Sequence, residues 1–436
     1  MYPRAISAWV RTSLLDPSLD AMNFLNEATG RYPDAISFAP GRPAEEHFAV
    51  RDAIDAVDTW VRREEAERGE SPEAVFRRLG QYGATGGLIR DLVAKQLERD
   101  EGIRAPPESI LVTCGAQEAM AIVAVGLFDP RRDVLLTSDP AYIGITGLAR
   151  ILDLPVEPVP TGELGLEVSR IRAAIERIRS AGMRPRALYD VPDFNNPQGT
   201  SLPMATRREL LQLAEDEDLL ILEDNPYGMF AYDGEPAPTL KSLDEHHRVV
   251  YLGTFSKTLF PGLRLGYLVA DQPVVDNDRP SLLAEALSRV KSLVTVNTSP
   301  LLQAMAGGLL LEHGGSLRAR VAESLPYYRA NRDRMLAALD DAFGDSRPAK
   351  GISWNRPAGG FFLTVRLPFA FGAEELEACA RDFGVLCCPL SIFSIAGRGR
   401  DQIRLSFSYV TPEDIDEGIR RLAGFVADRL SRGAEG

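Results

Sequence analysis

The sequence contains few of the residues that build several common kinds of site. Histidine and cysteine occur four times each, without the spacing of a metal site, and metal is not expected. Four cysteines do not form a disulfide framework in a chain of 436 residues. Lysine is also scarce, because the 49 basic residues include only Lys95, Lys241, Lys257, Lys291 and Lys350. Chemistry that needs a lysine amine therefore has few possible positions.

Long hydrophobic runs are absent as well. No apolar stretch approaches the ~20 residues that span a bilayer, and segment 301–312 is expected to be a short buried helix. The first 22 residues include Asp16 and Asp20 and lack the apolar segment of a secretion signal. The formal net charge of -13 argues against nucleic acid and anionic membrane surfaces as partners. We therefore expect a cytoplasmic protein with no nucleic-acid or membrane partner.

Six short apolar runs occupy the middle of the chain. In several places they are separated by amphipathic segments, such as 168–182 and 204–218. This alternation predicts an α/β fold, with a mostly parallel sheet between helices. The six runs are 109–115, 133–140, 186–194, 219–227, 248–257 and 263–270.

Polar and glycine residues gather at one end of these runs. Such sheets bind ligands outside the carboxyl ends of their strands, so a site is predicted there. The segments concerned are Cys114–Gln117, Ser138–Tyr142, Asp193–Gly199, Asp224–Tyr227 and Thr254–Lys257.

The pattern changes after about residue 281 to long helices, followed by an α+β tail of normal domain size. We expect residues 1–50 to be an N-terminal segment that packs with a small domain of residues 321–436. Residues 51–320 are expected to form a large cofactor-binding domain. The charged stretch 64–74 is expected to be solvated.

The segment GTFSKTLFPGLRLGY around Lys257 suits a phosphorylated pyridine aldehyde. A lysine amine tuned toward neutrality forms an imine with an aldehyde. Thr254 and Ser256 add hydroxyl donors, and Arg264 offers a bidentate cation for a phosphate. A lone lysine is ordinarily a solvated surface residue, but this one follows an apolar strand and precedes an arginine in a Pro-Gly loop. The segment therefore predicts a cofactor-binding lysine.

Asp224 ends the run LLILED. A carboxylate at a strand terminus can pair with a pyridinium nitrogen and keep it protonated, so that the ring accepts electrons. Tyr227, three residues later, could donate to the phenolic oxygen of the same ring. A turn residue before Asn225 is the alternative interpretation of Asp224, and its co-occurrence with Lys257 favours the cofactor.

Three further segments fit the same ligand. Gly115, Ala116 and Gln117 form a strand-to-helix turn, where free N–H groups favour a phosphate. Tyr142 could stack on the ring. Asn196 precedes a proline that favours an extended backbone, so its amide could reach the cofactor oxygen.

Arg404 lies in the predicted strand QIRLSFSY. An arginine inside an apolar strand is costly unless it is paired. A substrate α-carboxylate and a structural salt bridge are both suitable partners.

Together these motifs resemble the fold-type I, class I/II aminotransferases. The resemblance rests on CGAQEA, DPAY, NNPQG, EDNPY, TFSKTLFPGLRLGY and IRLSFS, and runs from near Gly41 to the C-terminus. Within this family, the sequence most resembles the kynurenine/2-aminoadipate aminotransferases and the aminotransferase-like half of MocR-type regulators.

The resemblance implies a pyridoxal 5′-phosphate (PLP) enzyme with an L-amino acid and a 2-oxo acid as substrates. It makes Lys257 the Schiff-base lysine and Asp224 the pyridine partner. It also implies a homodimer with shared active sites, in which Tyr82 reaches the phosphate of the neighbouring subunit. By the same resemblance, Tyr227 and Asn196 bind the ring oxygen, and Tyr142 stacks on the ring. The substrate is bound by Arg404, Asn196 and Gly41. The phosphate is bound by Gly115, Ala116, Gln117, Thr254, Ser256 and Arg264.

This chain departs from the family pattern at Ala116, at Gln198 and at Pro40-Gly41, where the family commonly has Ser, Thr and Gly-Gly. The segment 40–43, PGRP with Arg42, would lie beside the substrate side chain.

Two other functions stay open. The first is a different PLP-dependent reaction on the same scaffold, such as elimination, replacement, carbon–carbon bond formation or oxidation, since a fold does not choose among them. The second is a MocR-type sensor, which is disfavoured because only about 40 residues precede the matched region, too few for a DNA-binding domain.

Overall fold

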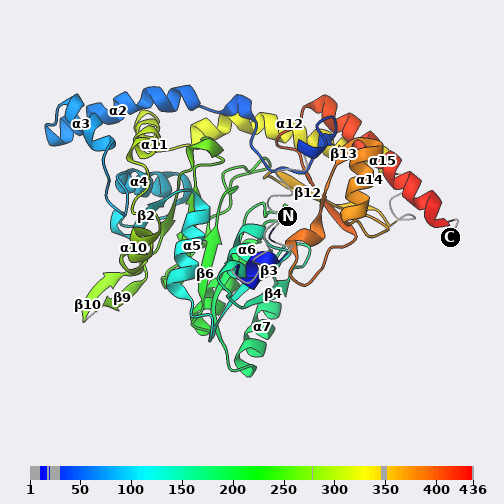
Figure 1. Cartoon of the computed structure of the whole chain (residues 1–436), viewed down its shortest axis with the longest axis horizontal. Helices are drawn as coiled ribbons and strands as arrows, with labels where there is room; N and C mark the ends of the chain where they lie inside the picture. Colours follow the sequence, from blue (N-terminus) through cyan, green and yellow to red (C-terminus); the bar gives the residue numbers. More distant parts are fainter. Residues whose placement is uncertain (1–9, 17–18, 20–29, 277, 345–350, 435–436) are drawn as a thin grey trace, which may run out of the picture.

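The computed structural model describes residues 10–16, 19, 30–276, 278–344 and 351–434. Its centre is a seven-stranded sheet in the order β2-β8-β7-β6-β5-β3-β4, with helices on both sides (Figure 1). Every neighbouring pair is parallel except the two that involve β8. The strands are β2 (Ile110–Thr113), β3 (Asp133–Asp139), β4 (Val156–Pro160), β5 (Arg184–Asp190), β6 (Leu220–Asp224), β7 (Val249–Thr254) and β8 (Gly266–Val269).

The six predicted runs are six of these strands, and the mostly parallel sheet is confirmed. The seventh strand, β4, was not predicted. It lies at the sheet edge beside β3, contains two prolines and is mostly half-buried, so its sequence lacks the continuous apolar run of a central strand.

Helices cover the sheet as the amphipathic segments indicate. In α7 (Val168–Ser180) the buried residues are Ile171, Ala174, Ile175 and Ile178, at helical spacing along one face. The other helices around the sheet are α5 (Ala116–Leu127), α6 (Ile143–Ile151), α8 (Met204–Asp216), α9 (Leu240–Leu243) and α10 (Leu283–Val294). A hairpin of β9 (Pro273–Asp276) and β10 (Arg279–Leu282) extends from this region (Figure 1).

A second helical layer is formed by α2 (Val50–Arg68), α3 (Pro72–Leu79), α4 (Arg90–Glu101) and α11 (Pro300–Glu312). The predicted short buried helix at 301–312 is α11, which packs closely on α2 because Gly308 leaves no side chain against the Ala56 carbonyl. The expectation of a solvated stretch at 64–74 is wrong at Glu64. This residue is 2% exposed and forms ion pairs with Arg68 and Arg78. No helix in the described ranges has the length and apolar character needed to cross a membrane.

The C-terminal part has its own four-stranded sheet in the order β11-β12-β15-β14. Its strands are β11 (Ser353–Trp354), β12 (Phe362–Arg366), β14 (Cys388–Pro389) and β15 (Gln402–Ser406). The accompanying helices are α12 (Arg318–Phe343), α14 (Ala373–Phe383) and α15 (Pro412–Ala434). Near the N-terminus, β1 (Ile36–Ser37) pairs with β13 (Val385–Leu386), which joins the start of the chain to this part.

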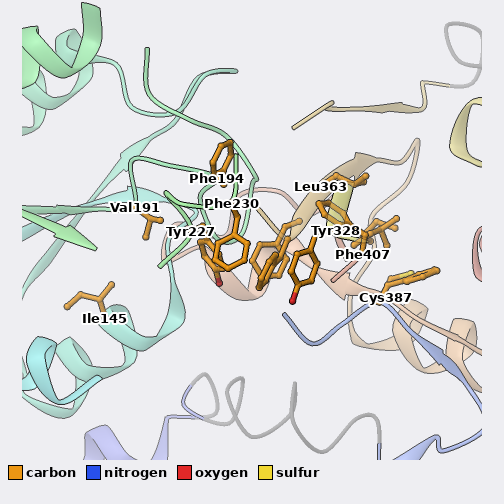
Figure 2. Packing of buried hydrophobic residues seen from close by; sticks show 14 of the residues in the cluster. Ile145, Val191, Phe194, Tyr227, Phe230, Tyr328, Leu363, Cys387 and Phe407 are labelled. Carbon is orange, nitrogen blue, oxygen red and sulfur yellow. The ribbon is translucent and has the colours of Figure 1, made fainter. Parts of the chain in front are cut away.

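One hydrophobic core continues from the central sheet into the C-terminal part. Figure 2 shows Tyr227 and Phe230, which follow β6, beside Tyr328 of α12 and near Leu363 of β12. The ring centroids of Phe230 and of Phe361, which precedes β12, lie 5.0 Å apart. Residues at the carboxyl end of the central sheet are therefore packed directly against the C-terminal sheet.

Candidate functional site

The carboxyl ends of the central strands open into a cavity of about 280 Å³. Besides the strand ends, it is lined by the segment 39–42, the start of α5 and Arg404 of β15. Asp224 is the one carboxylate among its lining residues. The cavity brings together twelve of the predicted site residues: Gly41, Ala116, Gln117, Tyr142, Asn196, Asp224, Tyr227, Thr254, Ser256, Lys257, Arg264 and Arg404.

Lys257 follows β7 by three residues and is partly buried at the cavity wall. Its Nζ donates to the Gly41 carbonyl oxygen at 3.4 Å and has no salt bridge with a described carboxylate. Burial, assisted by the charge of Arg264, lowers the pKa of Lys257 to about 8 against the opposing charge of Asp224. A substantial fraction of this amine is therefore neutral near pH 8, as an imine-forming lysine requires.

The other described lysines do not offer such an amine. Lys241 forms ion pairs with Asp244 and Asp271, and Lys291 forms one with Glu118. Lys95 is exposed on α4. Among the described lysines, Lys257 is therefore the best placed for chemistry on an aldehyde.

Asp224 is the last residue of β6 and is 4% exposed. The Tyr189 hydroxyl donates to its Oδ2 at 2.6 Å, whereas its buried Oδ1 has no hydrogen-bond partner among the described residues. Burial raises the pKa of Asp224 to about 7, although the Tyr189 hydrogen bond and the charge of Lys257 oppose this rise. An unpaired buried carboxylate oxygen is costly, so this one is suited to a cationic N–H donor.

The turn between β2 and α5 forms an anion cradle at one end of the cavity. Gly115, the N-cap of α5, has φ 78°, and a Cβ there would lie 2.7 Å from Nη2 of Arg264. The glycine thus leaves space between the helix N-terminus and the arginine, where helix N–H groups favour an anion. Thr254 and Ser256 add hydroxyls, and their Oγ atoms lie 3.0 Å apart.

Tyrosine side chains line the cavity next to Asp224. The Tyr142 hydroxyl lies 3.4 Å from Oε1 of Gln117, and burial raises the pKa of Tyr142 to about 12. Tyr227 is 4% exposed and lines the same cavity. Its hydroxyl stays protonated at neutral pH and has no hydrogen-bond partner among the described residues, so it can donate to a ligand.

Arg404 is a buried cation without a carboxylate partner in the described part of the chain. Its Nη1 donates to Oδ1 of Asn196 at 2.6 Å, Nη2 donates to the Ala39 carbonyl, and the buried Nε has no partner. The guanidinium lies 4.4 Å from the Phe362 ring centroid and 4.8 Å from that of Phe393. These contacts orient the cation while leaving its charge uncompensated, which fits an acidic ligand.

Gly41 fits closely against Phe362, since a Cβ on Gly41 would lie 2.2 Å from that ring. Sequence reasoning missed Phe362, Phe393 and Tyr189. Each lies in or near an apolar strand, where an aromatic residue ordinarily belongs to the core. Their contacts with Arg404 and Asp224 depend on which strands are neighbours, and no local signal indicates that.

Two predicted residues do not line the cavity. Gly115 is next to it and shapes it through its backbone. Tyr82 is 79% exposed and instead lines a separate hollow of about 430 Å³ with Arg68, Arg78 and Gly83.

The described residues fit a phosphorylated pyridine aldehyde. The Arg264–α5 cradle suits the phosphate, the free oxygen of Asp224 suits the ring nitrogen, and the amine of Lys257 suits the aldehyde. The described ranges contain no group of three side chains that could hold a metal ion.

Comparisons with known proteins agree with this assignment. The sequence model of the aminotransferase class I and II family matches residues 51–422. The chain is 44% identical to the (S)-3,5-dihydroxyphenylglycine transaminase of Amycolatopsis orientalis, over 96% of this chain and 94% of that protein. It is 33% identical to the 2-aminoadipate transaminase of Thermus thermophilus, over 89% of each chain. The structure superposes on the Pyrococcus horikoshii kynurenine aminotransferase with a TM-score of 0.83 at 26% identity, over 98% of this chain and 99% of that one.

Proposed function

The chain belongs to the class I and II aminotransferases, and from this premise we propose that it transfers the amino group of an aromatic amino acid of the arylglycine type. The fold is aspartate-aminotransferase-like, the cofactor is PLP and the reaction is amino-group transfer. The substrate, the roles of individual residues and the assembly are the proposed parts.

An arylglycine carries its aromatic ring directly on the α-carbon. The relative with 44% identity is named for such a substrate, which supports the same class here. Apolar and aromatic side chains of the cavity offer a surface for a flat ring close to the reacting carbon, which adds support. They are Met120, Ile143, Val191, Phe362 and Phe393.

The observation that carries the assignment of residue roles is that Lys257 and Asp224 line the same cavity. When bound, PLP supplies an aldehyde for the amino group and a ring that delocalises the electron pair left by the α-proton. Lys257 would bind the aldehyde carbon of the cofactor, and its amine would serve as the base for the proton on the substrate α-carbon. The carboxylate of Asp224 keeps the ring nitrogen protonated.

The other lining residues orient the reactants. Arg404 binds the α-carboxylate of the amino donor and then that of the 2-oxo acid acceptor. Asn196 accepts a hydrogen bond from Arg404 and so holds the guanidinium in place. The amide of Asn196 would also bind the cofactor oxygen, together with Tyr227. Tyr142 stacks on the ring, and Arg264 with the start of α5 binds the phosphate.

We propose a homodimer with shared sites, in which Tyr82 completes the phosphate site of the neighbouring subunit. The exposed Tyr82 side chain supports this arrangement. So do Leu293, Val294 and Leu301 on α10 and α11, which are 89%, 61% and 44% exposed, because such apolar residues are typically covered in an assembly.

The division of the chain into residues 1–50, 51–320 and 321–436 stays a prediction, and so does the cytoplasmic location. The separate four-stranded sheet and the β1–β13 pair support the division.

A half-reaction tests the proposed function. The PLP-loaded protein is mixed with (S)-3,5-dihydroxyphenylglycine or L-phenylglycine without any 2-oxo acid, with L-alanine as the comparison donor. We expect loss of the yellow colour, one bound pyridoxamine phosphate and one released arylglyoxylate per site. Repeated turnover without an acceptor would contradict amino transfer and favour another PLP reaction. Conversion by L-alanine alone would contradict the proposed substrate.

A further inference from the structure

The first turn of α5 contains a buried acid beside the anion cradle. Glu118 lies three residues after Gly115, the N-cap of this helix, and its side chain is 8% exposed. Its Oε2 accepts a hydrogen bond from the backbone N–H of Cys114. An acid in the first turn interacts favourably with the helix dipole, as an anion bound at the helix N-terminus does. Glu118 therefore places a negative charge close to the group that the cradle would bind.

Lys291 of α10 neutralises this acid. Its side chain is fully buried, and its Nζ donates to both carboxylate oxygens of Glu118, at 3.1 and 3.2 Å. The hydroxyls of Thr295 and Thr298 accept from the same ammonium at 3.2 and 3.0 Å. A buried charge is costly unless it is paired and hydrogen-bonded, and removing one partner leaves the other uncompensated. Without Lys291, Glu118 would therefore carry an uncompensated negative charge next to the cradle.

The same ammonium is connected to the strand that leads into the cradle. The Thr298 hydroxyl donates to the Val112 carbonyl of β2 at 2.9 Å, and Sγ of Cys114 lies 3.9 Å from that hydroxyl. Cys114 is the residue between β2 and the N-cap of α5. Neither Glu118 nor Lys291 lines the cavity. Both side chains therefore act on a ligand through the turn and through their charge, without touching it.

We propose that Glu118 and Lys291 are positioning residues that set the preference of the cofactor site for a phosphorylated aldehyde. The inference rests on the proposed binding of the phosphate by Arg264 and the start of α5. Glu118 holds the Cys114 N–H and thereby the turn, and Lys291 cancels the charge with which Glu118 would repel the phosphate. A phosphate monoester carries about two negative charges at pH 8, so this repulsion is strong in a poorly solvated site.

Two pyridine aldehydes provide the test, because pyridoxal lacks the phosphate that PLP carries. Their dissociation constants are measured at pH 8 on the full-length cofactor-free protein, by the absorbance of the bound aldehyde. The ratio of the pyridoxal constant to the PLP constant is compared among wild type, Lys291→Met, Glu118→Gln and the double variant. Lys241→Met is the matched control, because Lys241 is also buried and paired with acids but does not line the cavity.

We expect the ratio to fall at least ~10-fold in Lys291→Met, because an uncompensated Glu118 repels the phosphate and leaves pyridoxal binding unchanged. Glu118→Gln should keep the wild-type ratio or exceed it, since its amide oxygen still accepts from the Cys114 N–H without a negative charge. The double variant should recover most of the ratio, because the repelling charge is gone. Lys241→Met should leave the ratio unchanged.

Equal weakening of both aldehydes in Lys291→Met, or an unchanged ratio, would overturn the proposal. A double variant with a ratio as low as that of Lys291→Met would also overturn it, because lost packing would then explain the effect. If wild type bound pyridoxal as tightly as PLP, the phosphate would not be held at α5, and the inference would fail with that placement. No amino donor takes part, so the outcome is independent of whether arylglycines are turned over.

Discussion

The Tyr189 hydroxyl donates a 2.6 Å hydrogen bond to Oδ2 of Asp224 and leaves Oδ1 of that carboxylate free at the cavity. Tyr189 lies in β5, beside Leu222 of the adjacent strand β6. The hydrogen bond orients the carboxylate and opposes the rise in its pKa that burial causes. Asp224 is thereby prepared to receive one N–H donor on its free oxygen.

Replacing Tyr189 by Phe should weaken PLP binding by about 10- to 100-fold, since hydrogen bonds to charged groups contribute about 1.5–3 kcal/mol. The pKa of Asp224 should rise further in this variant. The PLP dissociation constant, measured by absorbance between pH 6 and 8, tests this effect, which should be largest at the acidic end. Tyr232→Phe is the matched control, because its buried hydroxyl donates to Gly360 outside the cavity. Equal weakening in both variants would mean a general loss of stability.

The rate of PLP recombination with the cofactor-free protein should rise with pH through about 8. The neutral amine forms the imine, and the pKa of Lys257 is lowered to about 8. Arg42→Gln should move this midpoint upward, because removing a positive charge favours the ammonium form. The ionisation of free PLP is the same for every protein, so comparing variants isolates the lysine. Arg400→Gln is the control, because Arg400 is exposed and does not line the cavity. An unchanged or lower midpoint in Arg42→Gln would contradict the proximity of Arg42 to Lys257.

Arg404→Ala should weaken the binding of amino acids and of 2-oxo acids alike, because this cation would bind the α-carboxylate of both. Losing a buried charged contact costs about 2–5 kcal/mol. We expect kcat/KM to fall by at least thirtyfold for every substrate, while the PLP dissociation constant changes little. Arg404→Lys should recover only part of the loss, since it lacks the planar fork. A loss confined to one substrate would place its α-carboxylate elsewhere.

Shared sites predict that two impaired variants restore one another. A heterodimer of Tyr82→Phe and Lys257→Ala chains contains one site with an intact Lys257 and the intact Tyr82 of the partner. Activity of the mixture after subunit exchange should therefore exceed the sum of the separate activities. A fully active monomer, measured by light scattering under assay conditions, would contradict the dimer.

The residues proposed to contact the reacting groups could be predicted from the sequence. Lys257 and Asp224 directly follow or end apolar strands, and parallel strands bring their carboxyl ends to one sheet edge. Arg404 was recognisable because a cation inside an apolar strand requires a partner. Composition helped as well, because so few lysines compete with Lys257.

The supporting contacts could not be predicted. Tyr189 reaches Asp224 because β5 and β6 are neighbours, and Phe362 and Phe393 enclose Arg404 because the C-terminal sheet packs on this edge. Glu64 looked solvated because its burial and its ion pair with Arg78 arise only when α3 packs against α2, whereas its other partner, Arg68, lies four residues later on α2 itself. Apart from that local pair, each of these contacts depends on tertiary neighbours rather than on local pattern.

Reductive trapping identifies the lysine that binds the cofactor, which we assign to Lys257. The PLP-loaded protein is treated with borohydride, digested and mapped by mass spectrometry. We expect one pyridoxyl group per chain, on the peptide that contains Lys257, and none after prior conversion of the cofactor by an amino donor. A pyridoxyl group on Lys95, Lys241, Lys291 or Lys350, with Lys257 unmodified, would contradict it.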